Sequence, residues 1–370
     1  MKVVAVLGTR PEVIKLAPVI AELRRSPEAE TVVVSTGQHR ELLDQMLRQF
    51  ELEPDIDLGV MRPQQRLPDL TGELIKSLGK TIAALRPDWV LVQGDTSTTL
   101  CGALAAFYED IPVAHVEAGL RTGDNRSPFP EEANRRLVAG LASLHLSPTP
   151  RSAANLIREA VPKERVTVTG NTVIDALLWA VPRARDLAPL FPRRRRFRVL
   201  LTLHRRESQG ETMRRACVAV KALARRFDVE IVFPVHRNPA VRNVVMPQLA
   251  NLAGVHLCEP LDYLSLVHVL DSSDLVLTDS GGLQEESPTL GKPVLVLRDT
   301  TERPEAIEAG VARLVGTEPG RIVRAVAQLL DDPLAYATMA HAENPFGDGL
   351  ASRRIVQALA EHIELARCAA

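Results

Sequence analysis

Short apolar runs alternate along the chain with longer amphipathic stretches, a pattern typical of a doubly wound parallel sheet. The runs have the length of buried strands, and the stretches between them repeat apolar residues with the period of a helix. In the first half of the chain the predicted strands are residues 3–8, 31–36, 89–93, 112–116, 144–148 and 166–170. In the second half they are residues 197–203, 229–235, 255–260, 275–279 and 293–299. We therefore expect an α/β protein with two Rossmann-like doubly wound domains and a ligand cleft between them.

A polar, proline-bearing and basic stretch, residues 182–198, separates the two series of strands. Its four consecutive arginines, Arg193 to Arg196, are typical either of a nucleic-acid contact or of a solvated linker. The formal net charge of the whole chain is −1, and non-specific nucleic-acid binding needs a surplus of basic residues. We therefore interpret the stretch as a linker and expect no nucleic-acid partner.

Length and composition narrow the class of protein further. A chain of 370 residues exceeds what one compact core holds and suits two domains. No apolar run approaches the length of a bilayer span, and the N-terminal residues enter a strand without the shape of a signal peptide. We expect no membrane association and a cytoplasmic location. The four cysteines are far apart and have no metal-ligand spacing, so we interpret them as reduced thiols and expect no metal site.

Three carboxylates stand at positions where parallel α/β sheets commonly bind their ligands. Asp95 and Glu117 each follow an apolar strand, and Glu131 opens a predicted helix. Residues just past the carboxyl ends of parallel strands line the ligand crevice. Carboxylates that converge there repel one another, and their pKa values are pushed apart, which suits general acid/base chemistry. The alternative is that Asp95 caps the helix that follows it and that the two glutamates are solvated loop residues.

Two strand-to-helix turns are suited to holding an anion. The segment 7–19 carries Arg10 and Lys15 near a helix N-terminus, where free N–H groups favour negative charge. The segment 277–297 carries the second set: Ser280, Gly281, Gly282 and Glu286. Its serine and glycines can present N–H groups and a hydroxyl to a diphosphate, and its glutamate is placed to bind a ribose diol. Such turns also occur in α/β proteins as plain geometry, and neither turn has the spacing of a P-loop or of GxGxxG.

Histidine–arginine pairs follow two strands of the second series, in segments 201–207 and 233–239. A cation at His204, with Arg205 and Arg206 beside it, would neutralise a departing phosphate. A lone histidine at a strand end is more often structural. The chain has no GxSxG elbow and no carboxylate–histidine set with metal-ligand spacing, which argues against those kinds of hydrolase.

Seven motifs in one order, GTRPE, GDT, HVEAGLRT, PEEANR, TLHRRE, DSGGLQEE and RDTTERPE, resemble those of the non-hydrolysing UDP-N-acetylglucosamine 2-epimerases. The resemblance runs from Lys2 to about Arg354. It implies a glycosyltransferase-B-like fold in which a C-terminal helix, residues 349–367, crosses back to the first domain. The implied domains are residues 1–169 plus 352–370, which carry the catalytic carboxylates, and residues 170–351, which bind UDP.

The resemblance also implies an activity and the residues that carry it. The reaction would be reversible conversion of UDP-N-acetylglucosamine (UDP-GlcNAc) to UDP-N-acetylmannosamine (UDP-ManNAc), by a homodimer and without a cofactor. The implied catalytic residues are Asp95, Glu117, Glu131 and His204, and the implied UDP contacts are Arg10, Lys15, Ser280, Gly281, Gly282, Glu286 and Arg303. Some bacterial members of the family bind a second, activating UDP-GlcNAc, and the matching positions here are Gln38, His39, Arg205, Arg206 and His236. Glu41 and Gln64 depart from the pattern of regulated relatives, so we expect this activation to be weak.

Three alternatives remain open on the sequence. A glycosyltransferase of the same fold would share the phosphate loop and the ribose contact, but it would not need three carboxylates on the first domain. A hydrolysing epimerase would release UDP and free N-acetylmannosamine. A non-catalytic UDP-sugar sensor would bind without turnover.

Overall fold

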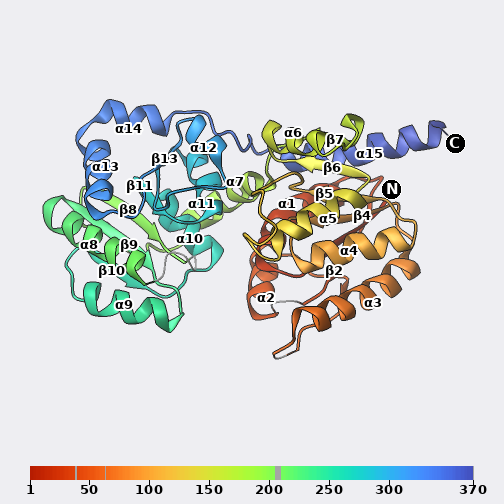
Figure 1. Ribbon diagram of the computed structural model, residues 1–370, viewed down its shortest axis with the longest axis horizontal. Helices are drawn as coiled ribbons and strands as arrows, with labels where there is room; N and C mark the ends of the chain where they lie inside the picture. Colours follow the sequence, from red (N-terminus) through yellow and green to blue (C-terminus); the bar gives the residue numbers. More distant parts are fainter. Residues whose placement is uncertain (38–39, 63, 205–209, 370) are drawn as a thin grey trace. The chain divides into compact units, whose positions relative to one another are not determined.

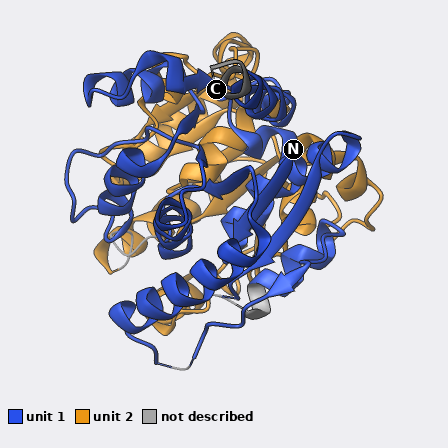
Figure 2. Ribbon diagram, turned by 90° about the vertical axis from the view of Figure 1, so that its right-hand side faces the viewer, with its two compact units in different colours: residues 1–176, 346–370 blue, residues 177–345 orange. Residues whose placement is uncertain are grey.

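The computed structural model describes residues 1–37, 40–62, 64–204 and 210–369. The chain divides into two compact units, unit 1 (residues 1–176 and 346–370) and unit 2 (residues 177–345) (Figure 2). Each unit is built on a parallel sheet with helices packed against it (Figure 1). This arrangement confirms the predicted α/β class with two doubly wound domains.

The described part of unit 1 contains a seven-stranded sheet in the order β3-β2-β1-β4-β5-β6-β7. Its strands are β1 (Lys2–Leu7), β2 (Glu30–Ser35), β3 (Ile56–Asp57), β4 (Trp89–Gln93), β5 (Val113–Val116), β6 (Leu144–Ser147) and β7 (Val166–Val168). Its helices are α1 (Arg10–Arg25), α2 (Arg40–Gln49), α3 (Leu67–Leu85), α4 (Ser97–Tyr108), α5 (Glu131–Leu141), α6 (Pro150–Arg158) and α15 (Ala351–Ala369). The strand order reverses between β1 and β4, so the crevice at which such sheets bind ligands opens at the carboxyl ends of these strands.

Burial explains why the apolar runs of unit 1 became strands. Every residue of β4 and β5 is buried, as are Val3 to Leu7 of β1. Strands covered by helices on both faces need such continuous apolar sequences. The apolar side of α3 adds Leu70, Leu74, Leu78 and Ile82 to the same core. These four residues recur at every fourth position, which is the spacing that lines one face of a helix.

Unit 2 repeats the design with a six-stranded parallel sheet in the order β10-β9-β8-β11-β12-β13 among its described residues. Its strands are β8 (Phe197–Thr202), β9 (Val229–Pro234), β10 (Val255–Cys258), β11 (Leu275–Thr278), β12 (Val294–Val296) and β13 (Ala312–Leu314). Its helices are α8 (Glu211–Arg226), α9 (Pro239–Leu249), α10 (Tyr263–Asp271), α11 (Gly281–Glu286), α12 (Pro304–Glu308), α13 (Pro319–Asp331) and α14 (Pro333–Ala340). Here the order reverses between β8 and β11, whose carboxyl ends lead to His204 and Ser280.

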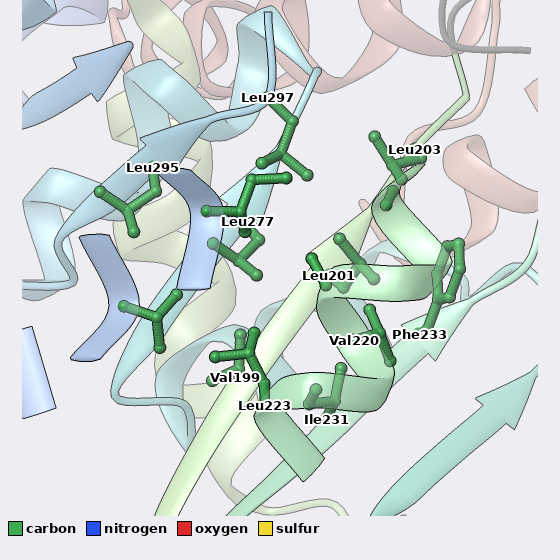
Figure 3. Close-up of a cluster of buried hydrophobic side chains, with 14 of the residues drawn as sticks. Val199, Leu201, Leu203, Val220, Leu223, Ile231, Phe233, Leu277, Leu295 and Leu297 are labelled. Carbon is green, nitrogen blue, oxygen red and sulfur yellow. The ribbon is translucent and has the colours of Figure 1, made fainter. Parts of the chain in front are cut away.

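The core of unit 2 forms where α8 packs on the sheet (Figure 3). Val220 and Leu223 of α8 share one cluster of buried side chains with alternate residues of the strands, among them Leu201, Ile231 and Leu277. All five side chains are at most 2% exposed. Alternate residues of a strand share one face of the sheet, so the polar residues after the strands are carried on a rigid base.

The chain crosses from unit 1 to unit 2 within α7 (Thr172–Arg185) and returns to unit 1 at Phe346, shortly before α15. Asp175 caps the start of α15 by accepting hydrogen bonds from the backbone N–H groups of Ser352 (2.8 Å) and Ala351 (3.3 Å). Further along the helix, the indole N–H of Trp89 donates to the carbonyl oxygen of Leu359 at 3.3 Å. The C-terminal helix therefore belongs to the first domain, as predicted.

The basic stretch 182–198 covers the end of α7, a largely exposed loop and the start of β8. Its arginines are tied into unit 2: Arg193 pairs with Asp274, and the backbone N–H of Arg194 donates to Glu230 at 3.0 Å. Arg198, which is 3% exposed, forms a buried ion pair with the same glutamate at 2.6 Å. These carboxylates lie far along the sequence, so a charge pattern read locally could not reveal them.

Among the described helices, none is both long and apolar enough to cross a membrane.

Candidate active site

Glu117 directly follows β5, at the side of the unit 1 sheet where the carboxyl ends of its strands lie. The Lys15 ammonium group forms an ion pair with its carboxylate, the amide of Gln93 donates to it, and the amide of Asn171 lies 3.5 Å away. The side chain of Glu117 is 7% exposed. Its backbone has φ of 64°, a conformation that non-glycine residues adopt seldom and that often marks a functional position. Lys15, predicted to contact UDP, is thus brought to a predicted catalytic carboxylate.

Asp95 follows β4, the neighbour of β5 in the sheet. The guanidinium of Arg135 contacts its Oδ2 atom through Nε at 2.8 Å and through Nη2 at 2.7 Å. The amide of Asn134 donates to the backbone carbonyl of Asp95 at 2.8 Å. The helix cap is Thr96, whose hydroxyl accepts a hydrogen bond from a backbone N–H of α4, and not Asp95. The simple capping role considered for Asp95 therefore does not apply.

Two adjacent glutamates at the start of α5 have different surroundings. The Oε2 atom of Glu131 is buried and has no hydrogen-bond partner among the described residues. Glu132 is fully buried and accepts hydrogen bonds from the backbone N–H groups of Thr122 (3.1 Å) and Gly123 (3.2 Å). A buried carboxylate oxygen without a partner costs free energy, so it marks a place where a ligand can bind. Glu131 therefore fits a role in binding or catalysis, and Glu132 is structural.

The sheet of unit 1 brings Asp95 and Glu117 to the same side, where the carboxyl ends of its strands lie. Gln93 of β4 pairs in register with Val116 of β5, so Asp95 and Glu117 leave neighbouring strands at almost the same level. A Cβ atom added to Gly94 would lie 3.8 Å from a carboxylate oxygen of Glu117. Glu131 stands one helical turn before Arg135, which holds Asp95, and residues four apart share a face of a helix.

A fourth carboxylate, Glu12, holds the turns after β1 and β4 and was missed by the sequence analysis. Its Oε2 atom accepts the backbone N–H groups of Gly8 and Thr9, both at 2.7 Å. Its Oε1 atom accepts the hydroxyls of Thr96 (2.5 Å) and Thr99 (3.2 Å). One buried side chain thus joins the turn after β1 to the turn after β4. The spacing Thr9-x-x-Glu12 is that of a capping box and could have revealed it.

Buried His115 supports the same turn. Its Nε2 atom lies 2.7 Å from the carbonyl oxygen of Gly94. Burial lowers the pKa of His115 to about 4, so the ring is neutral at pH 7. We interpret it as a structural group that holds the residue before Asp95. Arg10, predicted to contact UDP, is the first residue of α1 and is half-buried.

Four of the UDP contacts predicted in unit 2 lie together. Ser280 is the residue before α11, and Gly281 and Gly282 open the helix. A Cβ atom on Gly282 would lie 3.5 Å from Glu286 Oε2 and 3.8 Å from the hydroxyl of Ser280. The hydroxyl of Tyr263 donates to Glu286 Oε1 at 3.1 Å. Lack of a side chain at Gly282 therefore leaves room beside the Glu286 carboxylate.

Arg303, the remaining predicted UDP contact, precedes α12. Its Nε atom forms an ion pair with Glu285, a carboxylate that is 1% exposed. The structure thus anchors this guanidinium to α11, at the residue before Glu286.

His204 follows β8 and is oriented by a buried carboxylate that the sequence analysis did not single out. Its Nδ1 atom lies 3.0 Å from Oδ1 of Asp279. Its backbone N–H donates to both oxygens of the same carboxylate, at 3.2 and 3.0 Å. Asp279 is fully buried, whereas the imidazole is half exposed. With Nδ1 directed to Asp279, Nε2 is the nitrogen that can meet a phosphate oxygen.

Few of the predicted regulatory residues can be placed. Gln38, His39, Arg205 and Arg206 lie outside the described residues. His236 is exposed, and its Nδ1 atom accepts the backbone N–H of Asn238 at 3.1 Å. Within the described ranges, no group of three or more histidine, cysteine, aspartate or glutamate side chains is arranged to hold a metal ion.

Comparison with known proteins adds independent support. The family model described as UDP-N-acetylglucosamine 2-epimerase matches residues 21–360. The UDP-N-acetylglucosamine 2-epimerase of Yersinia pestis is 50% identical over 372 residues, which cover 98% of this chain and 99% of that protein. The protein of the same name from Escherichia coli K12 is 50% identical over 369 residues, covering 97% and 98% of the two chains.

Solved structures agree with these relatives. The crystal structure of UDP-GlcNAc 2-epimerase from Neisseria meningitidis bound to UDP-GlcNAc matches with a TM-score of 0.91 and 47% identity, covering 98% of this chain and all of that one. The enzyme from Methanocaldococcus jannaschii matches with a TM-score of 0.84 and 32% identity, again over 98% and 100% of the chains. The likeness confirms the predicted glycosyltransferase-B-like fold class. The chain belongs to the UDP-N-acetylglucosamine 2-epimerase family, a family of isomerases.

Proposed function

We propose that the protein interconverts UDP-GlcNAc and UDP-ManNAc by eliminating UDP, forming 2-acetamidoglucal, and adding UDP back. The observation that carries this proposal is the set of three carboxylates at one edge of the sheet of unit 1, held in three different ways. Asp95 is held by an arginine, Glu117 by a lysine, and Glu131 keeps a buried oxygen without a partner among the described residues.

The chemistry of the substrate explains why such a set is needed. Carbon 2 of an N-acetyl sugar has no carbonyl group beside it, so its proton is too weakly acidic for direct removal. Departure of UDP from carbon 1 creates oxocarbenium character, which acidifies that proton. Inverting the centre then requires a base on one face of the sugar and an acid on the other, and hence more than one carboxylate.

Cationic groups should assist departure of the diphosphate. We assign this role to His204, Arg10 and Lys15. An ammonium group has three hydrogens, so Lys15 can donate to Glu117 and still donate to a phosphate oxygen. We assign UDP binding to Ser280, Gly281, Gly282, Glu286 and Arg303. In this proposal residues 1–169 plus 352–370 form the domain that carries the acid/base groups, and residues 170–351 form the domain that binds UDP.

Turnover in deuterium oxide should place deuterium on carbon 2 of both UDP-sugars, because the carbon 2 proton leaves and is replaced from solvent. A small amount of 2-acetamidoglucal and UDP should also escape. Proton NMR of purified protein incubated with UDP-GlcNAc measures both results.

Other outcomes of that experiment contradict the proposal. Epimerisation that retains the original hydrogen would exclude elimination and re-addition. Free N-acetylmannosamine and UDP as the main products would indicate a hydrolysing epimerase. Binding of UDP-GlcNAc without any turnover would indicate a sensor.

Asp279→Asn is expected to lower kcat by about tenfold to a hundredfold, since a misoriented catalytic group costs about that much. The affinity for UDP should change much less, because Asp279 is fully buried behind His204. Asp271→Asn is the matched control: this carboxylate also lies in unit 2 and forms an ion pair, with Arg185 at 2.7 Å. Unchanged kcat in Asp279→Asn would show that the imidazole does not depend on this contact.

We also propose that the enzyme acts in the cytoplasm as a homodimer. The described cysteines Cys101, Cys217 and Cys258 are free thiols, as in proteins of a reducing compartment. The helices α4 and α5 pack against each other and expose Phe107, Tyr108 and Leu137, which are 56%, 68% and 57% exposed. Large apolar side chains exposed on adjacent helices are typical of a protein interface.

A further inference from the structure

Arg135 of α5 reaches across unit 1 to the loop after β4. Its Nε and Nη2 atoms both contact Oδ2 of Asp95, at 2.8 and 2.7 Å. A guanidinium that donates twice fixes the direction of a carboxylate more closely than a single donor does. Because both donors meet the same oxygen, Oδ1 is the oxygen of Asp95 that can exchange a proton.

The guanidinium is itself held in place. The side chain of Arg135 is 10% exposed, and its Nη1 atom donates to Oε2 of Glu132 at 3.0 Å. Glu132 is fully buried and is fixed by the backbone N–H groups of Thr122 and Gly123. Arg135 therefore has one carboxylate that anchors it and a second that it orients. A buried side chain with such contacts loses little further freedom when it orients a partner.

The same turn of α5 holds the backbone of Asp95 as well. Asn134 donates to the Asp95 carbonyl oxygen at 2.8 Å. Backbone and side chain of Asp95 are thus fixed by adjacent residues of one helix, and that helix begins at Glu131. Any displacement of α5 would move Asp95 and Glu131 together.

We propose that Arg135 is the positioning residue of Asp95: it directs Oδ1 toward the sugar, with Glu132 as its anchor. The inference rests on the proposed epimerisation and assigns Arg135 no contact with the substrate. It explains why a glutamate, an asparagine and an arginine follow Glu131 in the segment PEEANR.

The test compares Arg135→Ala with Arg136→Ala. Arg136 is the next residue of the same helix and approaches the same Glu132, at 3.6 Å, but its side chain is 43% exposed. Arg135→Ala should lower kcat by about a hundredfold, as loss of orientation does, with KM and the dissociation constant of UDP changed less than about threefold. Arg136→Ala should stay within about twofold of wild type, since exposed ion pairs contribute little.

Chemical rescue separates positioning from simple structural support. Guanidinium chloride at non-denaturing concentrations should raise the kcat of Arg135→Ala at least about tenfold, since a free guanidinium can donate to both carboxylates. It should restore nothing in Asp95→Asn. Adding Arg135→Ala to Asp95→Asn should lower kcat little further, because both changes remove one interaction.

Each result decides the inference. A near-normal kcat in Arg135→Ala overturns the inference. A loss of kcat that guanidinium cannot restore, accompanied by weaker UDP binding, overturns it as well. If Arg135→Ala fails to fold, Arg135→Lys replaces it, because lysine keeps the charge and loses the double contact. Arg135→Lys should show a lower kcat at an unchanged melting temperature. A normal kcat in this variant would overturn the inference. Absence of epimerisation by the wild-type protein would instead refute the proposed function.

Discussion

Asp95→Asn, Glu117→Gln and Glu131→Gln are each expected to lower kcat about a thousandfold, the order found for positioned acid and base groups. Each change keeps the shape of the side chain and removes its capacity to exchange a proton. The affinity for UDP should change far less, because the groups assigned to bind it lie mainly in unit 2. Rates follow from NMR of the UDP-GlcNAc and UDP-ManNAc signals, and affinities from calorimetry with UDP.

A carboxylate elsewhere in unit 1 serves as the control for these three variants. Asp110 is exposed at the end of α4 and has φ of 56°, which asparagine tolerates. Asp110→Asn should therefore retain wild-type kcat. If one of the three active-site variants behaves like this control, that carboxylate is a structural group and the mechanism needs only the other two.

Glu12→Ala is expected to destabilise unit 1 by about 3 kcal/mol, the order for removing a buried acceptor that serves several donors. Two backbone N–H groups and two threonine hydroxyls would lose their acceptor. Glu12→Gln should cost clearly less, because its carbonyl oxygen can accept the two N–H groups and the hydroxyls can turn to accept from its amide. The fluorescence of Trp89, measured during urea unfolding in a Trp179→Phe background, reports on unit 1.

The pH dependence of stability gives a second measure of Glu12. Burial raises the pKa of Glu12, although hydrogen bonds from Thr96 and from the Gly8 backbone act in the opposite direction. The native state therefore binds a proton more readily than the unfolded state, and stability falls as pH rises from the ordinary glutamate pKa through the raised one. Glu12→Gln should remove this slope. An equal slope in wild type and Glu12→Gln would show that other groups cause it.

Strands and their carboxyl ends could be predicted because they depend on local composition. All eleven predicted strands are present, and Asp95, Glu117, His204 and Ser280 follow strands as expected. The strands β3 and β13 were not predicted. Ile56–Asp57 and Ala312–Leu314 are too short and too polar to form an apolar run, and they are strands only because they pair at the edges of the sheets.

The supporting residues of the site could not be predicted in the same way, because their partners are distant in the sequence. Asp279 meets a histidine 75 residues earlier, and Arg135 meets an aspartate 40 residues earlier. The partners of Arg193 and Arg194, Asp274 and Glu230, could not be predicted for the same reason. Only Glu12 had a local signal, the capping-box spacing, which predicts a helix start and not a link between two turns.

The route of the chain through α15 also governs the order in which the protein can form during synthesis. Unit 2 is one continuous segment, residues 177–345, so it has all its strands once that segment has left the ribosome. Unit 1 must wait for residues 346–370, whose backbone accepts from Trp89 and is capped by Asp175. The N-terminal half is made first but completed last, reversing the usual order in which domains fold as they emerge. Until the last helix is translated, the face of α1 that packs against α15 stays uncovered.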